Sequence, residues 1–308
     1  MNKSRCNWLL AVIISMTAQN SQAGEKDLRP LFEKFGIGIY NQGARGTCSV
    51  FAVTGLLEFE FAHTSDTQVI PLSVEYLNWA SNQISGNPAD GSFFSDAVAA
   101  LNKYGISTED LFPYSASNYN SQAGPSVAAV SDAQKRCGVT ANWIKVWDPN
   151  TGMNDEQIEQ VKTSIMNEHP VAIGFRWPKM DDKYRKMVNG IMIVPPVEGV
   201  FDGHSVLLVG YKDDPDIPGS GFFIFKNSHG TDYGENGYGK MPYEYVRKYA
   251  NDGVDIQIVF HVHNSTSQIQ PRHMYISSES FGNKDGKEVM VIDKNYITPT
   301  LKLELPSQ

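Results

Sequence analysis

Apolar residues follow a helical pattern through the first half of the chain. From about Ser49 to Phe61 they cover nearly every face, which predicts a helix that is buried on all sides. Ser73 and Asn154 are residues typical of helix N-caps, and Gly105 is typical of a helix stop. These signals predict three further helices, over 74–82, 93–104 and 155–168.

The second half carries patterns typical of strands. Predicted strands occupy 171–175, 206–211, 222–227 and 253–263. The segment 114–149, rich in small and polar residues, predicts a connection that is partly loop. The order of elements indicates an α+β fold, with a helical lobe at about 42–140 and a β-rich lobe at about 141–263 that also takes in the N-terminal segment.

Residues 1–23 have the pattern of a secretory signal peptide. Lys3 and Arg5 precede a short apolar run, and a small-x-small site ends at Ala23. The run is shorter than the roughly 20 residues of a membrane span, so we expect a secreted or periplasmic protein with no membrane attachment after cleavage.

Charge narrows the choice of partners. The net charge of −8 becomes −10 without Lys3 and Arg5. A chain this acidic is not expected to bind nucleic acid or an anionic membrane surface.

Four residues are candidates for a catalytic site. Cys48 follows a glycine-rich loop and stands where the first predicted helix begins, so the helix dipole favours its thiolate. Gln42 lies six residues before it. His204 precedes one apolar strand and Asn227 ends the next, and two antiparallel neighbours can hold these side chains together.

The order Gln, Cys, His, Asn and the sequence motifs around these residues resemble the papain family of cysteine peptidases. The matching segments are Gln42 to Cys48, LSVEYL, YGISTEDLFPY, GHSVLLVGY and KNSHG followed by YGENGYG. The resemblance implies a two-lobed fold, with a helical left lobe and an antiparallel, β-barrel-like right lobe on either side of an active-site cleft. It also implies a divergent member, bacterial in origin, in which only 24–39 stands where the family usually has a helical pro-region.

The same resemblance assigns roles to the four residues. Cys48 is the nucleophile, His204 the base and then the acid, and Asn227 the residue that orients the imidazole. Gln42 and the backbone N–H of Cys48 form the oxyanion hole.

Six further residues are expected to contact the substrate. In this alignment Gly91 and Ser92 lie on the loop that lines the cleft, and Phe93 forms the wall of the pocket for the second residue before the cut. Phe93 could equally be an ordinary core aromatic. The other three candidates are Gly203, Ser205 and Tyr233.

This chain departs from the family pattern at several positions. Arg45 replaces a disulfide cysteine and Ser49 replaces an aromatic residue. His229 replaces a tryptophan that shields the histidine–asparagine hydrogen bond, and we expect it to admit solvent and weaken the orientation of His204. Tyr233 replaces a second tryptophan on the leaving-group side.

The expected function is hydrolysis of peptide bonds in peptides or proteins through a thioester acyl-enzyme. Two alternatives remain open: a weak or inactive homologue that binds peptides, or a papain-like transglutaminase or deamidase. No cofactor and no metal is expected, since His261 and His263 share one strand face without a third ligand.

Two features lie outside this chemistry. Cys137 is expected to be a free, buried thiol, because pairing with Cys48 would block the nucleophile. The extension 264–308 is too short to build a core alone, and one hypothesis is that it covers the cleft and inhibits the enzyme.

Overall fold

The computed structural model describes residues 24–120 and 123–258, and the backbone of 281–284 and 287–290. The chain divides into two compact units after residue 260, and each is described by itself. In the first unit the α-helices are α1 (Arg29–Lys34), α2 (Cys48–Ser65), α3 (Val74–Ser85), α4 (Phe94–Tyr104), α5 (Val127–Ala133), α6 (Asp155–Met166) and α7 (Tyr243–Tyr249).

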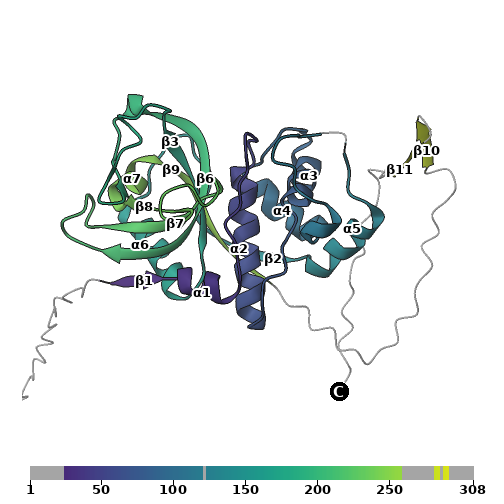
Figure 1. The fold of residues 1–308 in the computed structure, drawn as a ribbon, viewed down its shortest axis with the longest axis horizontal. Coiled ribbons are helices and arrows are strands. Elements are labelled where there is room, and N and C mark those ends of the chain that lie inside the picture. The colour runs from purple at the N-terminus through teal and green to yellow at the C-terminus, as the bar shows by residue number, and fades with distance from the viewer. Residues whose placement is uncertain (1–23, 121–122, 259–280, 285–286, 291–308) are drawn as a thin grey trace, which may run out of the picture. The chain divides into compact units, whose positions relative to one another are not determined.

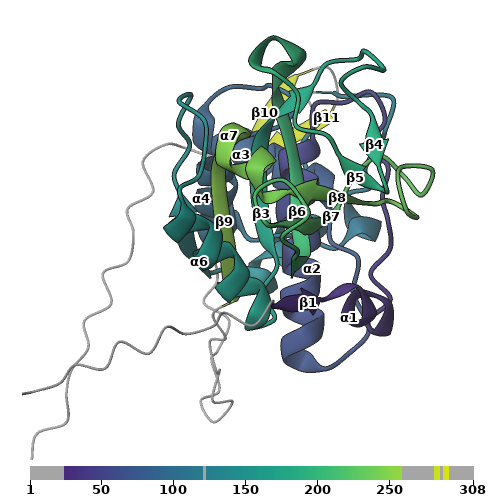
Figure 2. The same cartoon turned by 90° about the vertical axis from the view of Figure 1, so that its left-hand side faces the viewer.

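The helix α2 lies at the centre of the first unit. Figures 1 and 2 show it alongside the strand β6 (Val200–Asp213), with α3 and α4 on its other side. Twelve of its 18 residues are buried, as its apolar pattern predicts. The predicted caps of two other helices are also present, since Ser73 accepts from Tyr76 N–H and Asn154 forms a capping box with Gln157.

A nine-stranded sheet makes up the other part of this unit. Its remaining strands are β1 (Glu25–Asp27), β2 (Val139–Lys145), β3 (Val171–Pro178), β4 (Met187–Val188), β5 (Ile191–Met192), β7 (Gly221–Lys226), β8 (Tyr238–Pro242) and β9 (Ala250–Ile258). The strand order is β2-β9-β3-β6-β7-β8-β5-β4, with β1 paired to β6. The family-based expectation of a barrel-like sheet is therefore only partly met, because β2 and β4 end the order without pairing to each other.

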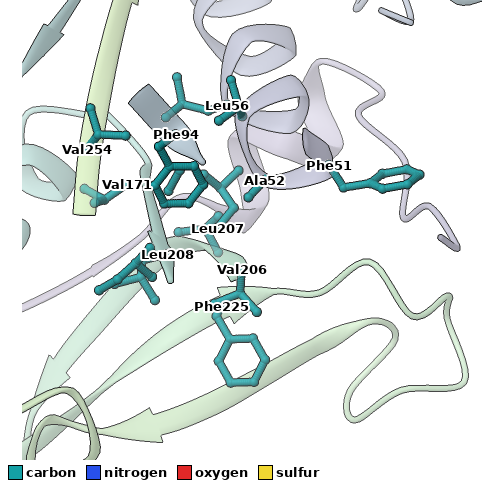
Figure 3. Close-up of a cluster of buried hydrophobic side chains, with 14 of the residues drawn as sticks. Phe51, Ala52, Leu56, Phe94, Val171, Val206, Leu207, Leu208, Phe225 and Val254 are labelled. Carbon is teal, nitrogen blue, oxygen red and sulfur yellow. The ribbon is translucent and has the colours of Figure 1, made fainter. Parts of the chain in front are cut away.

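The core between α2 and the sheet holds the helix in place. Figure 3 shows Ala52 and Leu56 of α2 next to Leu207 of β6, with Val171 of β3 and Val254 of β9 close by. All five are buried. Since burying a large apolar side chain contributes roughly 1.5–3 kcal/mol, moving α2 relative to the sheet would be costly. The N-terminus of α2 is thus a fixed point of the fold.

The segment 114–149 is more ordered than its composition suggests, because it contains α5 and β2. Cys137 is free as expected, yet it is only partly buried, and its thiol donates to the carbonyl of Asn102 at 3.2 Å. The prediction of a buried thiol is therefore wrong.

In the second unit, β10 (Phe281–Lys284) and β11 (Lys287–Met290) form an antiparallel hairpin. The end of the predicted strand 253–263, with the pair His261 and His263, lies outside the described residues. Within the described part of the chain, no helix has the length and apolar character needed to cross a membrane.

Candidate active site

Cys48 is the first residue of α2, where its thiol faces β6. Burial of the thiol raises its pKa above the ordinary value, and hydrogen bonds from the backbone and hydroxyl of Ser205 act in the opposite direction. Ser205 therefore supplies donors for a thiolate at this position.

His204 and Asn227 are brought together by the pairing of β6 with β7. Nε2 of His204 lies 2.9 Å from Oδ1 of Asn227, and the N–H of Ser228 donates to the same Oδ1 at 2.8 Å. Because the N–H of Ser228 requires an acceptor, this atom is the amide oxygen, and Nε2 of His204 must donate to it. In neutral His204 the proton is therefore on Nε2, and Nδ1 is free to accept another.

A β-bulge next to His204 sets the direction of its side chain. In the pairing of β3 with β6, Phe175 is opposite His204 and Arg176 is opposite Asp202, so Gly203 has no partner. Gly203 has φ of 104°, in the region that favours glycine.

Two rings cover the imidazole of His204. Trp177 of β3 lies 4.5 Å away and His229 stacks on it at 4.8 Å, measured between ring centroids. His204 is only 5% exposed, and this burial lowers its pKa to about 3. Solvent access through position 229, which the sequence led us to expect, is not observed, because the His229 ring itself stacks on His204 and Asn227 is buried.

Gln42 is held at both ends of its side-chain amide. Its Nε2 donates to the carbonyl of Arg45 at 2.7 Å, and its Oε1 accepts from the Ser228 hydroxyl at 2.5 Å. One Nε2 proton remains for another acceptor. Gln42 is buried next to the Cys48 loop but does not line the cavity described below.

Arg45 ties the loop before Cys48 to the rest of the helical lobe. Its guanidinium forms ion pairs with Glu75 of α3 and, at 2.9 Å, with Asp90. It also donates to the carbonyl of Ser115 at 2.9 Å and lies 4.4 Å from the ring centroid of Tyr114. A buried cation thus joins segments in the place where the family usually has a disulfide cysteine.

A cavity of about 360 Å³ adjoins these groups and is lined by both Cys48 and His204. Five of the six predicted substrate-binding residues line it: Gly91, Ser92, Phe93, Gly203 and Ser205. The sixth, Tyr233, does not, and instead packs against His229 and Phe225 with centroids 5.9 and 6.0 Å away.

The aromatic wall of this cavity has two members. Phe93 is 52% exposed, which excludes the reading of it as a core residue, and its ring lies 5.3 Å from that of Trp147. Trp147 is also exposed and lines the cavity.

Several residues of this region were missed from sequence. Ser228 holds Gln42, Trp177 covers His204, and Trp147 and Asp252 line the cavity. Ser228 could have been found, because it follows Asn227 directly in the KNS motif that matches the family. Trp177 and Asp252 depend on how distant strands pair, which no local pattern reveals.

Among residues 24–120 and 123–258, no group of three or more His, Cys, Asp or Glu side chains is arranged to hold a metal ion.

The family model described as "Papain family cysteine protease" matches residues 27–258. A viral cathepsin of Choristoneura fumiferana nuclear polyhedrosis virus is 31% identical over 201 residues, which is 65% of this chain and 54% of the relative. An uncharacterized peptidase C1-like protein of Acanthamoeba polyphaga mimivirus is 26% identical over 209 residues, which is 67% of this chain and 64% of the relative. The chain thus spans less than two thirds of the length of these curated relatives.

Among solved structures, the chain is similar in fold to xylellain, a cysteine protease from Xylella fastidiosa. The TM-score is 0.62 at 24% identity, over 77% of this chain and 86% of that one. Since the family model covers three quarters of the sequence, the chain belongs to the papain family of cysteine proteases.

Proposed function

We propose that the chain hydrolyses peptide bonds with Cys48 as nucleophile. The observation that carries this proposal is the hydrogen bond of 2.9 Å between His204 and Asn227. His204 lines the same cavity as Cys48. The hydrogen bond leaves Nδ1 of His204 as the atom that takes the thiol proton.

The proton transfer converts a neutral thiol and imidazole into an ion pair. Burial disfavours either charge alone, which is why the pKa of Cys48 is raised and that of His204 is lowered. Moving the proton from one to the other leaves the net charge of the cavity unchanged, and each new charge then stabilises the other.

The remaining steps follow from these positions. The thiolate attacks the substrate carbonyl, and the backbone N–H of Cys48 and the free Nε2 proton of Gln42 stabilise the oxyanion. His204 then gives its proton to the leaving amine, which leaves a thioester. Water, deprotonated by His204, hydrolyses the thioester and restores the thiol.

The test uses a thiol-directed epoxide and a set of fluorogenic peptides, with wild type and Cys48→Ala. We expect the epoxide to label Cys48 stoichiometrically, and Cys48→Ala to lose both labelling and hydrolysis. Labelling without hydrolysis of any peptide would favour a peptide-binding homologue. Incorporation of a primary amine into glutamine, or release of ammonia from it, would favour a transglutaminase or deamidase.

Two expectations about the chain as a whole are also proposals. We propose export from the cell, on the pattern of residues 1–23, to be tested by N-terminal sequencing of the mature protein. We also propose that 264–308 restrains activity. A chain ending at Asn264 should then turn over peptides faster than the full chain, and equal rates would contradict this.

A further inference from the structure

The floor of the cavity is a row of three residues on neighbouring strands. Gly174 of β3 is paired with Ser205 of β6 on one side and with Asp252 of β9 on the other. Directly paired residues of antiparallel strands point to the same face, and all three line the cavity. Because strands lie about 4.8 Å apart, the backbone of Asp252 is about 10 Å from the backbone of Ser205, the residue that contacts the Cys48 thiol.

Gly174 makes room for a carboxylate at this position. A Cβ atom on residue 174 would lie 2.3 Å from Oδ1 of Asp252 and 3.5 Å from the Ser205 hydroxyl. The Asp252 side chain therefore lies over Gly174, across the floor of the cavity. Its carboxylate accepts a hydrogen bond from the backbone N–H of Gly174.

The charge of Asp252 is not neutralised by an ion pair with any residue that the structure describes. Lys145 of β2 lowers the pKa of Asp252 through its charge, but its ammonium donates to the carbonyls of Gly152, Ala250 and Asn150 at 2.7, 3.1 and 3.2 Å. The other carboxylate on this cavity, Asp90, is already paired with Arg45. Asp252 is thus the acidic group of the cavity that is available to a ligand.

The mouth of the cavity also suits a cation. Phe93 and Trp147 are 52% and 46% exposed and line it together, and the faces of such rings attract ammonium and guanidinium groups. An apolar substrate side chain would instead bury the ionised carboxylate without a counter-ion, which is unfavourable.

We propose that this cavity is a subsite for a cationic side chain of the substrate, with its charged end against Asp252 and its stem along Phe93 and Trp147. Arginine fits better than lysine, because a planar guanidinium binds a carboxylate through two hydrogen bonds and stacks on aromatic rings. The loop that carries Phe93 resembles the papain-family loop that lines the pocket for the second residue before the cut. The cationic side chain therefore belongs to that residue of the substrate. The inference rests on the proposed peptidase function.

The test compares coumarin amides that differ only in the second residue before the cut, which is arginine, lysine, citrulline or norleucine. Citrulline has nearly the shape of arginine without its charge, so the ratio of kcat/KM between the two isolates the electrostatic contribution. The ratio is independent of the fraction of active enzyme. We expect wild type to prefer arginine by about tenfold or more.

Asp252→Asn should reduce this ratio to about 1 while citrulline and norleucine peptides are still hydrolysed. Gly174→Ala, whose Cβ would displace the carboxylate, should also lower it. Asp255→Asn is the matched control, since Asp255 is a buried carboxylate of the same strand that binds Ser164 and Asn142 and does not line the cavity. Its ratio should equal that of wild type.

An arginine-to-citrulline ratio near 1 in wild type, or one unchanged in Asp252→Asn, would overturn the inference and leave the peptidase function intact. Hydrolysis of no peptide by wild type would overturn both.

Discussion

Nε2 of His204 lies 2.9 Å from Oδ1 of Asn227, and this contact fixes both the orientation of the imidazole and the nitrogen that carries its proton. We expect Asn227→Ala to lower kcat/KM by about ten- to a hundredfold, because a buried hydrogen bond to the ring is lost. Steady-state kinetics with a single peptide would measure this. The rate of epoxide labelling should fall with it, and an unchanged labelling rate would argue against an orienting role.

The contact of Gln42 with Ser228 leads to a second prediction. Gln42→Ala should lower kcat by about a hundredfold with little change in KM, because the oxyanion donor acts only in the transition state. Ser228→Ala keeps the donor but removes the hydroxyl that holds its Oε1, so a smaller loss is expected. If Gln42→Ala raised KM by as much as it lowered kcat, a role in substrate binding would be indicated instead.

Replacing Arg45 tests whether its ion pairs maintain the loop before Cys48. Arg45→Met leaves the largely buried carboxylates of Glu75 and Asp90 without an ion-pair partner, which should lower the free energy of unfolding by about 3–5 kcal/mol. Urea unfolding would measure the loss. Arg29→Met is a suitable control, since its ion pairs with Asp27 and Glu235 are more exposed and should contribute less than about 1 kcal/mol. Similar losses in the two variants would contradict the prediction.

The pair formed by His169 and Glu60 gives a pH dependence of stability. Nδ1 of His169 lies 2.9 Å from Oε1 of Glu60, and this hydrogen bond raises the pKa of His169 above its ordinary value of 6.5. The folded state therefore binds the proton more tightly than the unfolded state. The stabilisation is fully present below pH 6.5 and is lost as the pH rises through the raised pKa.

The measurement is the difference in unfolding free energy between wild type and His169→Gln as a function of pH. We expect wild type to be more stable at mildly acidic pH and this advantage to shrink above it. An advantage that grows with pH would show that the sign of the coupling is wrong.

Asp252 predicts a pH dependence of substrate choice. Burial raises its pKa to about 7, against the opposing effects of the Gly174 N–H and of Lys145. The arginine-to-citrulline ratio should therefore rise as the pH increases toward and beyond about 7, and it should be flat in Asp252→Asn. Cys48 and His204 line the same cavity, but their titration affects both peptides alike and cancels in the ratio.

The parts of the fold that the sequence predicts well are those with local signals. The apolar residues that cover nearly every face of 49–61 indicate a buried helix, and the continuous apolar run at 206–211 indicates a buried strand. The caps at Ser73 and Asn154 are short-range hydrogen bonds. Strand β2 was missed because its exposed and buried residues do not form a continuous apolar run. It is held in place by pairing with β9, more than a hundred residues away.

The candidate site shows the same division. Cys48, His204 and Asn227 stand in motifs that can be recognised along the chain. In the structure His204 lies 2.9 Å from Asn227 and lines the same cavity as Cys48. Asp252 could not be recognised, because its position depends on the register of β9 against β3 and on the missing side chain of Gly174. A carboxylate in a sequence such as ANDGVD is ordinarily a solvated turn residue.

The Arg45 cluster has a consequence for the conditions in which the protein can work. A thiol nucleophile is active only while it is kept from oxidation, and reductants that protect it also break cystine bridges. Cys48 and Cys137 are both free, and the loop that carries Cys48 is joined to its neighbours by charge. Glutathione or dithiothreitol can therefore preserve the sulfur without loosening the loop that presents it.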